Sequence, residues 1–297
     1  MKRIDFIGTN GIGKSTTYHH LNQRRKRSRH KRWLTPREAK RRVAAADLLE
    51  QLTPTNLAKA ATCYLPRMGP VLADTYTLRS AEKAFADDPG EYGEFFDHCL
   101  SHLMNSRKVS AARQASQVAA HGRGAARDFA DGVEPVSRPP GYRGRTSQTV
   151  TPKHYVNLSW LFTQITELCL LESIDETVVF DESLAHSTVG LLTELSTDLA
   201  VRNHFEKMPV PQTLIYLTAP VDEIVRRIKI RRGDRGFPIV RYSRINEQQL
   251  RQRIRRSLRI NQIGASTLEW RGARVLCLDA MEPPQENARK IEAFIDA

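Results

Sequence analysis

The sequence predicts an α/β fold in which a parallel sheet of about five short strands is flanked by helices on both faces. Two observations support this prediction. Short apolar stretches alternate with longer segments whose apolar residues recur at helical spacing, and a glycine-rich stretch directly follows the first apolar stretch. The predicted strands are residues 2–8, 31–35, 177–180, 213–217 and 274–278. We expect residues 1–297 to form a single domain, in which residues 36–150 are a helical insertion.

The first half of the chain is predicted to be mainly helical after its first strand. One helix begins near Gly13, and a second runs from Pro36 to Leu49, because proline suits the first turn of a helix. Residues 54–130 are expected to be helical. The expected breaks are near Pro66, Gly69–Pro70, Pro89–Gly90 and Gly122–Gly124. Residues 131–152 contain clusters of Gly, Pro and Arg and few apolar residues, so we expect a flexible segment there.

The second half of the chain follows a clearer α/β pattern. A helix is expected from Pro152. Its buried face is predicted to carry Tyr155, Leu158, Phe162, Ile165 and Cys169. Further helices are expected over about 183–207, from Pro220 to Arg232, through Leu250, Ile254 and Leu258, and through Ala288, Ile291 and Ile295. Residues 233–243 are expected to form a loop.

The composition excludes several classes of protein. The apolar fraction of 40% is enough for a sizeable core, and it excludes a disordered acidic chain or a collagen-like chain. Stretches of eighteen apolar residues are absent and the mean hydropathy is −0.48, so we expect no membrane contact. The first eight residues lack the apolar core of a secretion signal, and the four cysteines are widely spaced. These features favour a cytoplasmic protein.

The chain is strongly basic, with 46 Lys and Arg against 33 Asp and Glu, which gives a net charge of +13. Within residues 24–42, eleven of nineteen side chains are Lys or Arg, and a second basic cluster spans residues 226–259. Both clusters could neutralise phosphates, while the first cluster taken alone could equally be a solvated helix face. The sequence contains none of the RRM, KH or zinc-finger patterns that would decide between these interpretations.

The most specific motif is Gly8-Thr9-Asn10-Gly11-Ile12-Gly13-Lys14-Ser15, which fits G-x-x-x-x-G-K-[ST] at every fixed position. Glycines allow main-chain N–H groups to surround phosphate oxygens, and the following helix adds a partial positive charge. We expect Lys14 to reach the β and γ phosphates of ATP and the Ser15 hydroxyl to ligate Mg²⁺. Thr16 completes the expected nucleotide contacts. The alternative is a glycine turn without function, but the flanking strand and helix favour the phosphate loop.

Two further segments carry candidate catalytic side chains. Asp181 and Glu182 follow a buried strand, where a carboxylate can hold Mg²⁺ or act as a base; the alternative is a helix cap. This pair of acids does not separate a kinase from an ATPase. Arg227 and Arg231 share a helix face that leads into a loop at Gly233–Gly236, so we expect them to belong to a lid over the phosphates. The alternative for this run is a solvated basic helix.

Together these segments resemble the P-loop nucleoside and nucleotide kinases, such as thymidylate kinase and the deoxynucleoside kinases. The matching stretches are DFIGTNGIGKST (5–16), VVFDESLAHS (178–187), LIYLTAPVDEIVRRIKIRR (214–232) and RVLCLDAMEPPQENARKIEAFI (274–295), the last with an adenine-side loop. The resemblance covers about residues 1–35 and 150–297. It implies a five-stranded parallel sheet, ATP with Mg²⁺ as cofactors, and phosphorylation of a hydroxyl or a monophosphate. It also implies that Asp181 lies at the reacting centre and that Arg227 and Arg231 are lid arginines.

The chain also departs from this family. Glu182 stands where those kinases have an arginine that clamps a phosphate. Residues 50–150 match no segment of the family, although they occupy the place where those enzymes hold the acceptor, and residues 35–38 resemble a thymidylate kinase segment over four positions only. The acceptor therefore cannot be carried over from the resemblance.

From these observations we expect an ATP-dependent phosphotransferase whose acceptor is a hydroxyl of a nucleotide. Residues 24–42 contain more basic side chains than the binding of a free mononucleotide requires. One candidate acceptor is therefore a hydroxymethylated pyrimidine within DNA. Certain viral DNA kinases with this kind of loop carry out that chemistry, and a viral chain would act in the host cytoplasm. The alternatives are a kinase of free nucleosides or nucleotides, a non-kinase P-loop ATPase that acts on nucleic acid, and a nucleic-acid binding module.

Overall fold

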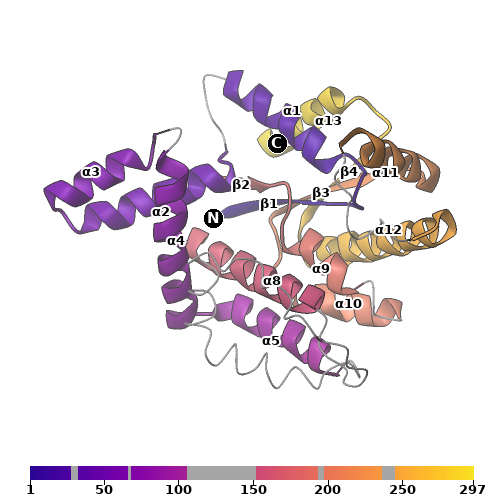
Figure 1. Cartoon of the computed structure of the whole chain (residues 1–297), viewed down its shortest axis with the longest axis horizontal. Helices are drawn as coiled ribbons and strands as arrows, with labels where there is room; N and C mark the ends of the chain where they lie inside the picture. Colours follow the sequence, from indigo (N-terminus) through magenta and orange to yellow (C-terminus); the bar gives the residue numbers. More distant parts are fainter. Residues whose placement is uncertain (28–32, 66–67, 106–151, 193–196, 236–244) are drawn as a thin grey trace, which may run out of the picture.

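A parallel sheet of four strands forms the centre of the computed structural model (Figure 1). The strand order is β2-β1-β3-β4, with β1 at Lys2–Ile7, β2 at Thr177–Phe180, β3 at Thr213–Thr218 and β4 at Arg274–Asp279. The structure describes residues 1–27, 33–65, 68–105, 152–192, 197–235 and 245–297. The prediction of an α/β fold with a parallel sheet is confirmed.

The fifth predicted strand, residues 31–35, appears in the described residues only as a single bridge. The Leu34 N–H donates to the Thr177 carbonyl at 2.8 Å, and the Val179 N–H donates to the Leu34 carbonyl at 3.0 Å. Leu34 therefore lies at the outer edge of β2. Residues 28–32 are outside the described residues, so the sheet has four strands and this one bridge in the part that the structure describes.

Helices cover both faces of the sheet (Figure 1). They are α1 Lys14–Arg27, α2 Pro36–Glu50, α3 Pro54–Thr62, α4 Met68–Asp87, α5 Gly90–Asn105, α8 Pro152–Leu171, α9 Leu184–Leu192, α10 Asp198–Lys207, α11 Val221–Arg235, α12 Glu247–Trp270 and α13 Pro284–Asp296. Helices α1, α11 and α13 lie on one face, and α5, α8, α9 and α10 lie on the other (Figure 1). Helix α12 contributes to the cores on both faces, with Ile254 in one and Ile260 in the other.

Burial on both faces explains the apolar strands. On β1, Ile4 and Phe6 belong to the core under α1, whereas Ile7 belongs to the core on the opposite face. A strand that is covered on both faces has a nearly continuous run of apolar residues in its sequence. The carboxyl ends of all four strands meet at one edge of the sheet, where the phosphate-loop motif follows β1.

Some helix boundaries differ from the prediction. Gly69–Pro70 does not interrupt a helix, because α4 begins at Met68. Proline is tolerated there since the N–H groups in the first turn of a helix have no hydrogen-bond partner within the helix. The single helix predicted over 183–207 is divided into α9 and α10, and residues 193–196 are outside the described residues. The loop predicted over 233–243 begins later, because α11 continues to Arg235.

The insertion between β1 and β2 contains α2 to α5 in its described part. Helices α2, α3 and α4 pack around a small core of their own and extend away from the sheet (Figure 1). Most of the predicted flexible segment 131–152 lies outside the described residues, and Pro152 begins α8. The described helices contain none long and apolar enough to traverse a lipid bilayer.

Candidate nucleotide-binding site

The phosphate loop runs from the end of β1 into the first turn of α1, as the sequence predicts. Gly11 has a φ of +86°, and a Cβ atom there would lie 2.7 Å from Cγ1 of Ile228 on α11. Gly13 has a φ of +112°, a backbone conformation that L side chains rarely adopt. The Ile12 N–H donates to the Thr9 carbonyl at 3.2 Å and closes the turn. These positions require glycine, which explains the spacing of the motif.

Lys14 is folded back over this loop. Its side chain is buried, and Nζ donates to the carbonyl oxygens of Gly8 at 2.7 Å and Thr9 at 3.4 Å. Burial lowers the pKa of Lys14 to about 8, even though the negative charges of Glu182 and Asp181 act to raise it. The ammonium group therefore lies in a dehydrated position where anionic phosphates would stabilise its charge.

Asp181 and Glu182 reach the same edge of the sheet because β2 pairs with β1 in parallel. Asp5 is opposite Phe180 in the register, so the next residue of β2 leaves the sheet beside the end of β1. Asp181 is half-buried, and its charge, together with burial, raises the pKa of Tyr18 on α1. Both acids thus lie near enough to Lys14 for their charges to act on its pKa.

The oxygen ligands of this edge fit Mg²⁺ bound together with phosphates. Ser15 and Thr16 are exposed in the first turn of α1, and Asp181 supplies a carboxylate. Mg²⁺ commonly takes one or two protein oxygens and completes its octahedron with phosphate and water. Among the described residues, groups of three or more His, Cys, Asp or Glu that could hold a metal by themselves are absent.

Arg227 differs from the expectation of a lid side chain that closes from a distance. Its Nη1 donates to the Ile12 carbonyl at 2.8 Å, and its Nη2 donates to the Ala280 carbonyl at 2.8 Å. Its Nε donates to Glu223 at 2.6 Å on the same helix. Arg227 thus joins α11, the phosphate loop and the turn after β4, which is the segment that the resemblance identifies as the adenine-side loop.

The rest of the predicted lid is only partly described. Arg231 lies one turn after Arg227 on α11, and its side chain is outside the described part. Gly233 to Arg235 belong to α11, and residues 236–244 are outside the described residues.

The chain matches no protein-family model, no curated protein and no solved structure. The site is therefore defined by the residues of this chain alone.

A polar network beneath the loop was not predicted. Asn261, fully buried on α12, donates from Nδ2 to the Thr9 hydroxyl at 3.2 Å, and Thr9 donates to the Ser257 hydroxyl at 3.1 Å. Ser257 and Asn261 are four residues apart and extend the apolar face marked by Leu250 and Ile254. Two polar residues on an apolar face are the sequence signal that could have revealed this network.

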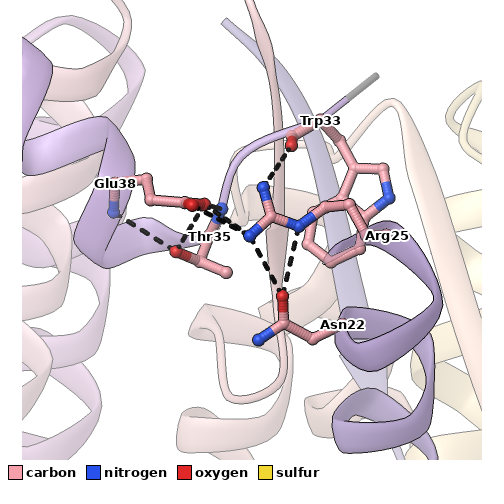
Figure 2. Close-up of polar contacts among 5 residues, drawn as sticks. All are labelled: Asn22, Arg25, Trp33, Thr35 and Glu38. Atoms are coloured by element: carbon pink, nitrogen blue, oxygen red, sulfur yellow. Dashed lines mark hydrogen bonds and ion pairs between the residues drawn. The ribbon is translucent and has the colours of Figure 1, made fainter. Parts of the chain in front are cut away.

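Four of the eight cations that the structure describes in residues 24–42 pair with acidic residues, and the other three cations of this stretch lie within residues 28–32, outside the described residues. The Arg25 side chain is only 3% exposed, and it donates to the Trp33 carbonyl at 3.1 Å and to Glu38 at 2.9 Å (Figure 2). It also donates to Asn22, and its Cζ lies 4.7 Å from the centroid of the Trp33 ring. Thr35 and Glu38 form a capping box at the start of α2 (Figure 2). Arg25 therefore joins α1 to α2.

Other cations of this stretch also have acidic partners. Arg24 pairs with Glu292, Lys40 with Asp74 and Glu167, and Arg42 with Glu176. Lys26, Arg27 and Arg37 are exposed. The abundance of Lys and Arg in residues 24–42 thus overstates the number of cations that could meet phosphates, because the sequence alone does not show which acids approach them from α4, α8 and α13.

Proposed function

We propose that the protein is an ATP-dependent phosphotransferase with a nucleotide-type acceptor. One observation carries this proposal: the glycine-rich loop encloses Lys14 while both acids after β2 act on the same ammonium group. This arrangement supports binding of a nucleotide triphosphate with its γ-phosphate close to a carboxylate. The cofactors of the proposed reaction are ATP and Mg²⁺.

The chain's own residues account for the proposed steps. Main-chain amides of residues 8–13 and Nζ of Lys14 bind the phosphate oxygens, and Ser15 with Asp181 would hold Mg²⁺, which neutralises phosphate charge. Asp181 orients the acceptor hydroxyl and accepts its proton. The acceptor oxygen forms a bond to the γ-phosphorus as the bond to the ADP oxygen breaks. Positioning and electrostatic stabilisation supply most of the acceleration in this class of reaction.

The nucleoside end of ATP would lie toward Arg227. Its guanidinium spans the carbonyls of Ile12 and Ala280, which belong to the phosphate loop and to the turn before α13. Both segments thus hold fixed positions on either side of this arginine. Arg231 would be the second arginine of the lid.

The acceptor that we propose is a hydroxyl on a nucleotide within DNA, such as a hydroxymethylated pyrimidine. The net charge of +13 supports a polyanionic partner. The helices α2 to α5, which lie between β1 and β2 in the sequence, would form the acceptor side. A free nucleoside or nucleotide is the competing acceptor.

A second function has an observation in its favour. Glu182 is exposed, follows Asp181 directly and acts electrostatically on Lys14, and two adjacent acids at this place are typical of ATPases in which the second acid orients water. A P-loop ATPase acting on nucleic acid therefore remains the competing function.

One experiment separates these functions. γ-labelled ATP is incubated with the protein and, in parallel, with free nucleosides, nucleoside monophosphates, and DNA with or without hydroxymethylated pyrimidines. We expect label in the modified DNA and none with Lys14→Ala. Label found only as free phosphate with every acceptor would identify an ATPase. Equal or better use of the free nucleoside would refute the DNA acceptor.

A further inference from the structure

A hollow of about 410 Å³ lies between the outer faces of α10 and α12. Trp270, at the end of α12, forms one side, and Arg202 of α10 and Arg259 of α12 belong to its lining. Gln262 and Ser266 add an amide and a hydroxyl. The hollow is separate from the phosphate loop, and the proposed reaction does not use it.

Trp270 is unusual among the tryptophans whose side chains the structure describes. It is 80% exposed, whereas Trp33 is 4% exposed. Leu268, two residues earlier on α12, is fully buried, so the helix has a well-packed face and Trp270 points away from it. An exposed indole lacks the large stabilisation that burial of its ring would provide. It presents a flat π surface on which a planar ring can stack.

Two cations, Arg202 and Arg259, line the same hollow as this ring, together with the acidic Glu206. Helix α12 has five arginines and two glutamates, a net charge of 5 − 2 = +3. Arg256 and Arg259 both donate to Asp198 at 3.0 Å, and Arg202 is exposed. Exposed ion pairs of this kind contribute only about 0–1 kcal/mol, so a phosphate can replace Asp198 as their partner at little cost. This distinguishes them from Arg25, whose guanidinium is buried and fully occupied.

We infer that the α10–α12 face binds single-stranded nucleic acid, with one base stacked on Trp270 and the neighbouring phosphates on Arg202 and Arg259. A stacking aromatic beside a cationic groove is the arrangement that binds single strands with little sequence preference. Glu206, also in the lining, can accept a hydrogen bond from an exocyclic amino group of a base. The choice of this partner rests on the proposed function, whose acceptor is part of a polynucleotide.

Helix α12 also connects this face to the phosphate loop. Asn261 binds Thr9, and nine residues separate it from Trp270, which is about 14 Å along a helix axis. Nine residues are also about two and a half turns of the helix, so Trp270 projects from the face of α12 opposite to the buried Asn261.

The test measures binding of a fluorescein-labelled single-stranded 12-mer to the full chain by anisotropy, without ATP. Stacking contributes about 1–3 kcal/mol per base, so we expect Trp270→Ala to bind about 5- to 150-fold more weakly. Trp270→Phe should retain most of the affinity. Arg202→Glu with Arg259→Glu should weaken binding and reduce its salt dependence. The matched controls are Leu199→Ala, which removes an exposed apolar side chain of α10 outside the hollow, and Arg289→Glu on α13.

Several outcomes would overturn the inference. The first is that Trp270→Ala binds the oligonucleotide as tightly as the wild-type protein, and the second is that Leu199→Ala loses as much affinity as Trp270→Ala. The third is that the protein binds a free mononucleotide as tightly as the oligonucleotide. The fourth is that sedimentation shows a dimer for the wild-type protein and a monomer for Trp270→Ala. The proposed function is tested apart from these, by phosphorylation of a free nucleoside and by Lys14→Ala, which should retain oligonucleotide binding. Absence of phosphotransfer by the wild-type protein to every acceptor, together with intact Trp270-dependent binding, would refute the kinase and leave this surface in place.

Discussion

Arg227 donates a hydrogen bond from Nη1 to the carbonyl oxygen of Ile12 at 2.8 Å, and this bond fixes α11 against the phosphate loop. The same guanidinium reaches Ala280 and Glu223. A single planar group thus sets the spacing of three segments that are far apart in the sequence. The geometry of the loop depends on this spacing before any nucleotide binds.

Replacing Arg227 with lysine should weaken binding of a non-hydrolysable ATP analogue by about tenfold. A lysine ammonium cannot satisfy both carbonyls and Glu223 with the planar fork that arginine provides. Isothermal titration calorimetry measures the change, and Arg226→Lys serves as the control, since Arg226 is exposed and bonds only Glu223 in the described residues. Equal affinities for the two variants would contradict the role assigned to Arg227.

Lys14→Ala should abolish phosphotransfer without unfolding the protein. The ammonium group donates to Gly8 and Thr9, but the turn is also closed by main-chain bonds such as Ile12 N–H to Thr9, so we expect the loop to persist without it. We expect turnover to fall by at least about a thousandfold, in line with loss of a preorganised cation at the transferring phosphate. Circular dichroism should remain unchanged. Lys26→Ala, an exposed position on α1, should keep full activity.

The affinity for ATP should fall as the pH rises above about 8. Burial lowers the pKa of Lys14 to about 8 in the free protein, and phosphate charge raises it in the complex. Between these two values the complex binds more protons than the free protein, so higher pH disfavours binding. Titration calorimetry in buffers of different ionisation enthalpy would reveal the proton uptake. Lys14→Arg stays charged and should lose this pH dependence; a decline of equal size in that variant would assign it to another group.

Glu182→Gln distinguishes phosphotransfer from hydrolysis. The change keeps the size of the side chain and removes its charge beside Lys14. In a kinase, transfer to the acceptor should persist within about tenfold, whereas in an ATPase, release of free phosphate should fall about a hundredfold or more. Asp181→Asn is the companion variant and should abolish transfer. Survival of full transfer in Asp181→Asn would exclude that carboxylate as the base.

Arg25→Met should destabilise the protein by about 3 kcal/mol, since removing one partner of a buried ion pair leaves the other uncompensated. Burial acts to raise the pKa of Glu38, but hydrogen bonds from Arg25 and Thr35 bring it below its ordinary value. The pair therefore stabilises the fold above the ordinary pKa of a glutamate and loses this effect as the pH falls through the lower value. Urea unfolding at pH 7 and pH 3 should show a smaller difference in acid. Lys26→Met is the control and should change stability by less than about 0.5 kcal/mol.

The sequence predicted those parts of the fold that depend on local pattern. The strand at Lys2–Ile7, the start of a helix at Pro36 and the phosphate loop follow from an apolar run, the preference of proline for a first helical turn and glycine spacing. It did not reveal that Arg3 and Asp5 are buried together, 3.3 Å apart, because their pairing depends on packing around the strand. Burial raises the pKa of Asp5, which Arg3 partly offsets.

The sequence likewise predicted the part of the candidate site that depends on strand topology, but not the contacts between residues far apart in the chain. Lys14 and Asp181 come together because parallel strands place their ends at one edge, a rule of topology. The contact of Asn261 with Thr9 joins residues 252 positions apart, and the partners of Arg24 and Arg42 lie 268 and 134 positions away. Such distances in sequence carry no local signal. The charge of residues 24–42 was therefore a weaker indication of DNA contact than its density implies.

The single bridge at Leu34 also bears on how the molecule behaves at high concentration. An edge strand with unpaired main-chain groups is a template on which another chain can add a strand and begin to aggregate. Here β2 is only four residues long, and Leu34 occupies hydrogen-bonding groups in its middle. A docking strand would find too few free main-chain groups to form a ladder, so we expect this side of the sheet to resist intermolecular β-pairing.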